Sequence, residues 1–231
     1  MFLNLKKKIH IIKNYKKFAS IDHLNYKNLV IYSEGSHDWP HIGPIIKKVI
    51  EISDMHISYL SSQIDDPGLD FNHKKFRKFY IGDGFIRTLI FHTIKCKVFL
   101  MTMPDLESYH LKRSSYKGIK YVYTFHSINS THVAYRDNAF KSYDEIYCVG
   151  PHHQNELKKE NEIHSLIDRK LIKIGSIKLD SLIDEFNQIK GPTKKTVKNI
   201  LLAPSWGPSS FAENSELIIS IVLAVLKSGY K

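Results

Sequence analysis

A histidine and a serine, His126 and Ser127, follow Phe125 at the end of a run of aromatic and β-branched residues at positions 119–124. Such residues favour a buried strand, and ligands of open α/β sheets bind at the carboxyl ends of the strands. An imidazole that titrates near neutrality can accept the proton of an attacking hydroxyl group. The pattern predicts His126 as a general base, although a single histidine after a strand is also typical of a hydrogen-bonded structural residue.

A second polar turn, Glu34-Gly35-Ser36, follows the apolar residues 28–33 and precedes a helix expected from about Pro40 or Ile42 to Ile52. The free N–H groups at the start of a helix can bind an anion. We therefore expect Glu34, Gly35 and Ser36 to contact a substrate, while turn chemistry alone also accounts for glycine and serine here. The sequence contains no Gly-x-Gly-x-x-Gly, so it does not predict a dinucleotide turn.

Two further segments lie towards the C-terminus. Residues 174–180 read Ile-Gly-Ser-Ile-Lys-Leu-Asp, and residues 199–206 read Asn-Ile-Leu-Leu-Ala-Pro-Ser-Trp. The second pattern predicts a strand over 199–203 that ends in a turn. Ser205 and Trp206 can then approach a cleft between domains and contact a substrate, or Trp206 can cover a core.

Three of these segments resemble the CDP-glycerol glycerophosphotransferase family, which makes teichoic-acid-type surface polymers. Residues 123–127 match an aromatic-His-small turn whose histidine is assigned as the catalytic base, with Ser127 where many members have glycine. Residues 174–180 resemble the Gly-x-x-x-x-Asp segment that closes the first domain, without the proline and arginine often seen there. Residues 199–206 resemble the strand and turn that open the second domain.

The resemblance implies an α/β, Rossmann-like parallel sheet of glycosyltransferase-B type. It also implies transfer of glycerol phosphate from CDP-glycerol to a lipid-linked polymer acceptor, with release of CMP and with His126 as the base. Nothing in the sequence calls for a metal ion or a cofactor. Two alternatives remain: another glycosyltransferase-B enzyme that uses a nucleotide sugar, and a non-catalytic module that binds the acceptor or a membrane.

We expect four parts along the chain. They are a basic amphipathic segment (1–20), an acceptor-side Rossmann-like domain (21–190), a linker rich in Pro, Gly and Lys (191–197), and the start of a donor-binding domain (198–231). Family members continue with an Arg-Pro-His-Pro-like strand and a Gly-Ser/Thr-rich turn that holds the donor phosphates. One strand and one helix cannot bury a core, so we expect a fragment that is inactive alone.

Alternating apolar runs and helical patterns predict the architecture of the larger domain. Strands are expected at residues 28–33, 56–60, 78–81, 97–101, 119–124 and 145–149. Helices are expected at 40–52, at 85–93 and from Ser130 or Thr131 to about Lys141. This alternation predicts a parallel, doubly wound sheet.

The chain carries 34 Lys and Arg against 23 Asp and Glu, a formal charge of +11, which favours acidic partners. No zinc-finger spacing, RNP-like segment or Arg-rich stripe is found, so nucleic acid is not the expected partner. Part of the charge lies in residues 1–18, where lysines alternate with apolar residues. This segment predicts a basic amphipathic helix, either on an anionic membrane surface or packed on the domain.

The sequence also bears on where the protein is located and on whether it binds a metal ion. No run approaches the ~20 apolar residues of a membrane span, and Cys96 and Cys148 lie in or beside apolar runs, as expected of buried reduced thiols. We expect a cytoplasmic protein, at the inner face of the cell membrane if the basic helix binds there. His152 and His153 point about 100° apart on a helix, so they do not predict a metal site.

Overall fold

The computed structural model describes residues 2–21, 25–166, 169–188, 200–203, 210 and 213–229, and the side chains from residue 6 onward within these ranges. The chain divides into two compact units, Met1–Asp184 and Glu185–Lys231, and each is described by itself. The predicted linker 191–197 lies outside the described residues, as do Ser205 and Trp206.

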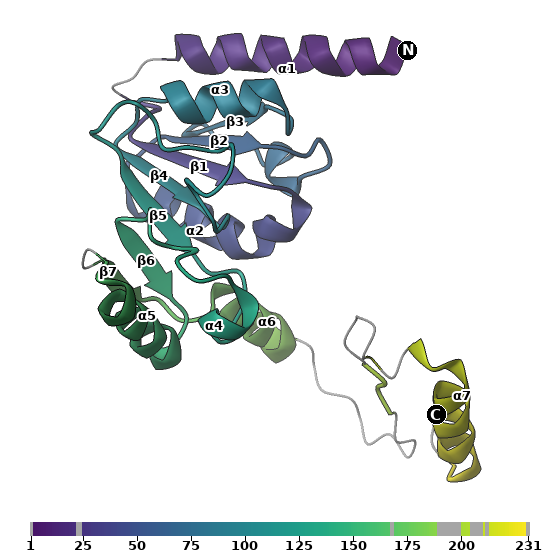
Figure 1. Cartoon of the computed structure of the whole chain (residues 1–231). Coiled ribbons are helices and arrows are strands. Elements are labelled where there is room, and N and C mark those ends of the chain that lie inside the picture. Colours follow the sequence, from purple (N-terminus) through teal and green to yellow (C-terminus); the bar gives the residue numbers. More distant parts are fainter. Residues whose placement is uncertain are drawn as a thin grey trace. The chain divides into compact units, whose positions relative to one another are not determined.

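The first unit is built on a seven-stranded, all-parallel sheet with the order β3-β2-β1-β4-β5-β6-β7 (Figure 1). Its strands are β1 (Leu29–Ser33), β2 (Ile57–Ser61), β3 (Phe76–Tyr80), β4 (Val98–Met101), β5 (Lys120–Thr124), β6 (Glu145–Cys148) and β7 (Lys170–Lys173). The chain runs outward from β1 to β3 and then returns to place β4 on the other side of β1. The strand order therefore reverses between β1 and β4, which is the topological switch point where ligands of such sheets bind.

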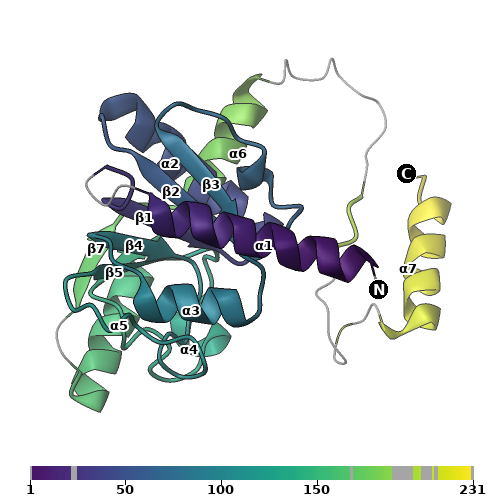
Figure 2. The same ribbon diagram turned by 90° about the horizontal axis from the view of Figure 1, so that it is seen from above.

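Helices cover both faces of the sheet. They are α1 (Phe2–Ser20), α2 (Trp39–Ile52), α3 (Phe85–Thr93), α4 (Thr131–Ala134), α5 (Pro151–His164) and α6 (Ile177–Gln188), with 3-10 turns η1 (Ser36–Asp38) and η2 (Pro67–Leu69). Helices α1 and α3 lie side by side on one face, and α2 lies on the other (Figures 1 and 2). This is a Rossmann-like α/β arrangement, which confirms the predicted fold class.

Alternation along the central strand divides the core into two layers. Leu29 and Ile31 of β1 pack with the isoleucines of α2, whereas Val30 and Tyr32 pack with α3 and the residues around it. Successive side chains of a strand point to opposite faces, so a strand buried on both faces must be apolar throughout. All five residues of β1 are buried, as the continuous apolar run predicts.

The six expected strands and the helices at 40–52 and 85–93 are present, with ends that differ by one or two residues. The helix expected to reach about Lys141 is wrong, because α4 ends at Ala134. Tyr135 already has extended backbone angles (φ −127°, ψ 160°), and Asn138 has a positive φ of 62° that a continuing helix does not allow.

Within its described residues, the second unit contains the end of α6 and helix α7 (Ser215–Lys227). Asn214 caps α7, since its Oδ1 accepts a 3.0 Å hydrogen bond from the Leu217 N–H. Residues 200–203 form no strand, contrary to the prediction for 199–203. A strand needs a ladder partner, and no other strand lies in the described part of this unit.

Cys96 and Cys148 are both buried free thiols, as predicted. Burial raises the pKa of Cys96 to about 12 and that of Cys148 to about 11, so neither is a thiolate near neutrality. Among the described helices, none combines the length and the apolar character needed to cross a bilayer.

Candidate functional site at the switch point

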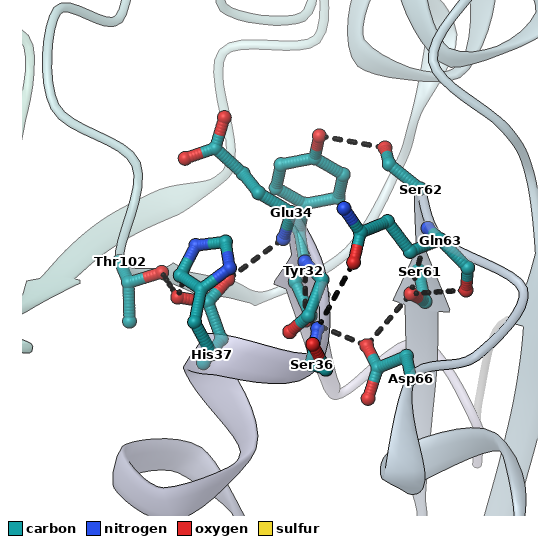
Figure 3. A network of polar contacts seen from close by, with 12 residues as sticks. Tyr32, Glu34, Ser36, His37, Ser61, Ser62, Gln63, Asp66 and Thr102 are labelled. Atoms are coloured by element: carbon teal, nitrogen blue, oxygen red, sulfur yellow. Dashed lines mark hydrogen bonds and ion pairs between the residues drawn. The ribbon is translucent and has the colours of Figure 1, made fainter.

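A buried carboxylate joins the two loops that flank the switch point. Asp38, 1% exposed, precedes α2 but does not cap it. Its Oδ2 accepts a 2.7 Å hydrogen bond from the Glu34 N–H, and its Oδ1 accepts one of 2.7 Å from Thr102 Oγ1 (Figure 3). Thr102 follows β4, so Asp38 fixes the turn after β1 against the loop after β4. His37 Nε2 lies 3.5 Å from the same Oδ1.

A second buried carboxylate fixes the ends of β1 and β2. Asp66 Oδ2 accepts hydrogen bonds of 2.7 Å from Ser33 Oγ and from Ser61 Oγ (Figure 3). It also accepts one of 2.8 Å from the Tyr59 hydroxyl. Its Oδ1 accepts a 2.8 Å bond from the Gly68 N–H. Every atom of this carboxylate is therefore used within the fold, and the cluster holds the strand ends in register.

The Glu34-Gly35-Ser36 turn is tied to the same region. The Gly35 N–H donates to Ser33 Oγ (3.2 Å), and the Ser36 N–H donates to Gln63 Oε1 (3.3 Å). A Cβ on Gly35 would lie 2.1 Å from Gln63 Oε1, so the turn packs closely on that side chain. These two N–H groups are occupied internally, which argues against the anion contact expected for Gly35 and Ser36.

Glu34 faces a different direction from its neighbours. Its carboxylate points away from Gln63 and Asp66 (Figure 3). Burial, followed by the Asp38 carboxylate, raises the pKa of Glu34, and the charge of Arg87 opposes that shift. Arg87 also donates from Nη1 to the Tyr32 hydroxyl at 3.3 Å. Glu34 is thus placed where an acid with a raised pKa can meet a ligand at the switch point.

His126 lies on a pocket of about 320 Å³. The pocket is lined by the end of β5 and the loop that follows, by α2 and by the start of α6: His41, Phe125, His126, Ser127, Ile128, Asn129, Val149, Ser176, Lys178, Leu179 and Leu182. The rings of His41 and His126 have their centroids 6.2 Å apart at an interplanar angle of 76°. Two histidines from different elements therefore face one pocket.

Both imidazoles are held in the neutral form at pH 7. Burial lowers the pKa of His126, while the Asp38 carboxylate and a hydrogen bond to the Thr102 main chain act in the opposite direction. Burial, His126 and Lys178 lower the pKa of His41 to about 4. His126 Nδ1 is buried and has no hydrogen-bond partner among the described residues. A neutral ring has the protonation state that a general base requires.

The start of α6 brings positive charge and a hydroxyl group to this pocket. Gly175, which follows β7, has a φ of 78°, a conformation that residues with a Cβ rarely adopt. The turn leads directly into α6 and places Ser176 and Lys178 on the pocket wall. A lysine ammonium and hydroxyl groups beside a neutral imidazole can hold an anionic group, such as a phosphate, next to a proton acceptor.

The loop after His126 is held by two histidines of α5. His152 Nε2 lies 3.1 Å from the Ile128 carbonyl oxygen, and His153 Nε2 lies 2.7 Å from that of Asn129. The His153 ring also packs on Phe125, with centroids 3.9 Å apart. Both histidines thus have a structural role in positioning the loop. Within the described residues, no group of three or more His, Cys, Asp or Glu side chains is arranged to hold a metal ion.

The predicted site residues fall into three sets. His126 and Ser127 share the pocket, although Ser127 Oγ accepts a 3.1 Å bond from the Asn129 N–H and so also shapes the turn. Glu34, Gly35 and Ser36 are not on the pocket wall, and the Glu34 N–H donates to Asp38. Ser205 and Trp206 are outside the described residues.

Sequence analysis missed three members of the site: His41, Thr102 and Lys178. His41 lies one helical turn after Asp38, and Thr102 directly follows a predicted strand. Both positions could therefore have been predicted to lie at the carboxyl end of the sheet. Lys178 lies within the Gly175–Asp180 segment that had been singled out for its resemblance, although not for its charge. Searches of protein-family models, of curated proteins and of solved structures give no match to this chain.

Proposed function

We propose that this chain is the acceptor-side domain of a phosphotransferase of the CDP-glycerol glycerophosphotransferase type, with His126 as the general base. The observation that carries the proposal is the meeting of two segments in one pocket: His126 and Ser127 after β5, and Ser176 and Lys178 before and within α6. These segments are about 50 residues apart in the sequence and were each singled out by the resemblance.

The proposed reaction uses the neutral His126 imidazole. An acceptor hydroxyl attacks the β-phosphorus of CDP-glycerol, a new P–O bond forms, the bond to CMP breaks, and the hydroxyl proton passes to His126. Lys178 supplies positive charge to a phosphate of the acceptor or of the transferred group. Burial of His126 keeps the ring unprotonated, and the Asp38 carboxylate limits how far its pKa falls.

Binding of the acceptor is the sharper test, because the resemblance puts the donor-phosphate contacts in a second domain. Short glycerol phosphate oligomers should cause saturable changes in the NMR signals of the His126 and His41 imidazoles. Lys178→Ala should weaken this binding about tenfold, since a charge-assisted contact is lost. Lys158→Ala, an exposed lysine of α5, is the matched control and should leave the affinity unchanged.

Turnover is tested by placing residues 1–190 before the donor-side domain of a family member and measuring CMP release. His126→Ala should lower the rate by a factor of about 10² to 10⁴. Activity with a nucleotide sugar in place of CDP-glycerol would favour the related glycosyltransferase. Oligomer binding without any His126-dependent turnover would favour a non-catalytic acceptor-binding module, and no oligomer binding at all would refute the proposal.

A further inference from the structure

Helix α1 has an inner face that packs on the sheet domain. Phe18 is 3% exposed, and its ring meets that of Phe79 with centroids 5.4 Å apart. Ile11 lies against Gly82, with its Cδ1 2.7 Å from the position that a Cβ would take. The helix is therefore part of the domain, and one of the two expectations for residues 1–20, packing on the domain, is met.

The outer face of α1 is basic and partly apolar. At 100° per residue, Ile9, Ile12, Lys13 and Lys16 project away from Phe18. Ile9 is 45% exposed and Ile12 is 46% exposed. The helix holds six lysines and no acidic residue: Lys6, Lys7, Lys8, Lys13, Lys16 and Lys17. None of the ion pairs between described residues involves one of them.

A groove of about 420 Å³ lies between α1 and the start of α3, which are neighbours in both views (Figures 1 and 2). Its walls are mainly apolar, with two lysines of α1 and one aspartate: Lys7, Lys8, Ile11, Ile12, Ile81, Asp83, Gly84, Phe85 and Ile86. Phe85, the first residue of α3, is 78% exposed. A large aromatic side chain left in water beside exposed isoleucines marks an interaction surface.

Positive charge continues from α1 along the edge of the sheet. Lys17 borders a hollow that it shares with Lys74, Arg77 and Lys78, on and just before the edge strand β3. The basic surface therefore extends beyond one helix, with the apolar side chains at one end of it. A surface of this composition fits the boundary of an anionic bilayer, where phosphates lie just outside the hydrocarbon.

We infer that α1 and the start of α3 form a docking surface for an anionic lipid bilayer, in which Ile9, Ile12 and Phe85 enter the acyl boundary and the lysines contact lipid phosphates. Charge complementarity selects this partner. A second copy of the chain would bring the same positive face against itself, and nucleic acid would leave the three apolar side chains in water.

Docking in this way would hold the candidate site near the membrane surface. Arg87 is in the first turn of α3, two residues after Phe85, and contacts the Tyr32 hydroxyl beside Glu34 at the switch point. The carboxyl edge of the sheet and the docking surface are thus adjacent. The inference stands on the surface alone and does not depend on the proposed function.

Co-sedimentation of the full chain with vesicles tests the inference. The chain should bind vesicles of phosphatidylcholine mixed with phosphatidylglycerol, should not bind pure phosphatidylcholine, and should be released by salt. The double variant Lys13→Glu/Lys16→Glu should bind at least about 25-fold more weakly, at about fivefold for each lysine. Phe85→Ser should weaken binding to the same vesicles. Salt should still release this variant, which would show that its lysines still contact the lipid phosphates.

The matched control is Lys47→Glu/Lys158→Glu, which makes the same charge change at exposed positions of α2 and α5. It should bind nearly as well as the wild type. Circular dichroism establishes that each variant is folded, as expected for exposed positions. Equal loss in both double variants would mean that net charge alone drives binding and would overturn the inference. The inference would also be overturned if the wild-type chain did not bind anionic vesicles, or if it bound duplex DNA more tightly than these vesicles.

Discussion

Thr102 Oγ1 donates a 2.7 Å hydrogen bond to Asp38 Oδ1, and both residues are 1% exposed. This contact connects the loop after β4 with the turn after β1, on the two sides of the switch point. The Asp38 carboxylate also accepts from the Glu34 N–H at 2.7 Å and acts on the pKa of His126. One buried group therefore joins the two loops of the site and also opposes the lowering of the His126 pKa by burial.

Asp38→Asn should reduce the free energy of unfolding by about 1 to 3 kcal/mol, because an amide cannot accept from both Thr102 and Glu34 with equal geometry. Loss of the negative charge should also move the pKa of His126 further below its usual value of 6.5. Urea unfolding and an NMR titration of the imidazole measure the two effects. Asp70→Asn, at an exposed position, should change neither, and an unchanged His126 titration in Asp38→Asn would contradict the assignment.

Asp66→Ala should be among the most destabilising single changes in the chain. It leaves the buried Tyr59 hydroxyl and the Gly68 N–H without their acceptor, whereas the hydroxyls of Ser33 and Ser61 keep the carbonyl oxygens of Gly35 and Gln63. Each unsatisfied buried group costs about 1 to 3 kcal/mol, so a loss of roughly 2 kcal/mol or more is expected in urea unfolding. Asp65→Ala, one residue earlier and exposed, should stay within about 0.5 kcal/mol of the wild type.

Much of the fold follows from local pattern. Residues 28–33 and 119–124 are apolar enough to predict strands buried on both faces, and both are central strands of the sheet. Strand β7 was missed because Lys170 and Lys173 leave only two apolar residues between them. Lysines on an edge strand protect it from pairing with other chains, and they also hide it from an analysis based on apolar runs.

The site was only partly predictable, because its contacts join residues distant in sequence. His126 could be found from the strand that precedes it. The partners of Asp38 and Asp66 could not, since 64 residues separate Asp38 from Thr102 and 33 separate Ser33 from Asp66. Such pairs depend on the strand order β2-β1-β4, which the alternation of strands and helices does not specify. Gly35 is an example: the sequence predicts its turn but does not predict that this turn packs against Gln63.

Gly175→Ala should destabilise the first unit by about 1 kcal/mol, because alanine must adopt a positive φ of 78° at this turn. It should also shift the NMR signals of His126, since the turn positions Ser176 and Lys178 on the same pocket. Gly84→Ala is the matched control: its φ is −100°, and nothing lies within 4 Å of an added Cβ. Equal effects of the two changes on thermal unfolding would show that the Gly175 turn is not specifically required.

His41 should make the protein less stable in acid. Its pKa in the folded protein is about 4, below the value of 6.5 expected in the unfolded chain. The unfolded state therefore binds the proton first, and the stability present above pH 6.5 is lost as the pH falls towards 4. The ring is only half-buried, so about 1 kcal/mol is expected after allowance for solvent screening.

His41→Gln removes the titrating group, so its unfolding free energy should fall less than that of the wild type between pH 6.5 and 4. Urea unfolding at a series of pH values in this range gives the comparison. His92→Gln, at an exposed position of α3, is the matched control and should keep the pH dependence of the wild type. A wild-type curve that His41→Gln leaves unchanged would mean that His41 protonates freely in the folded protein. The pocket would then carry a positive charge beside His126 in mild acid, and the neutral pair on which the proposed proton transfer depends would exist only at higher pH.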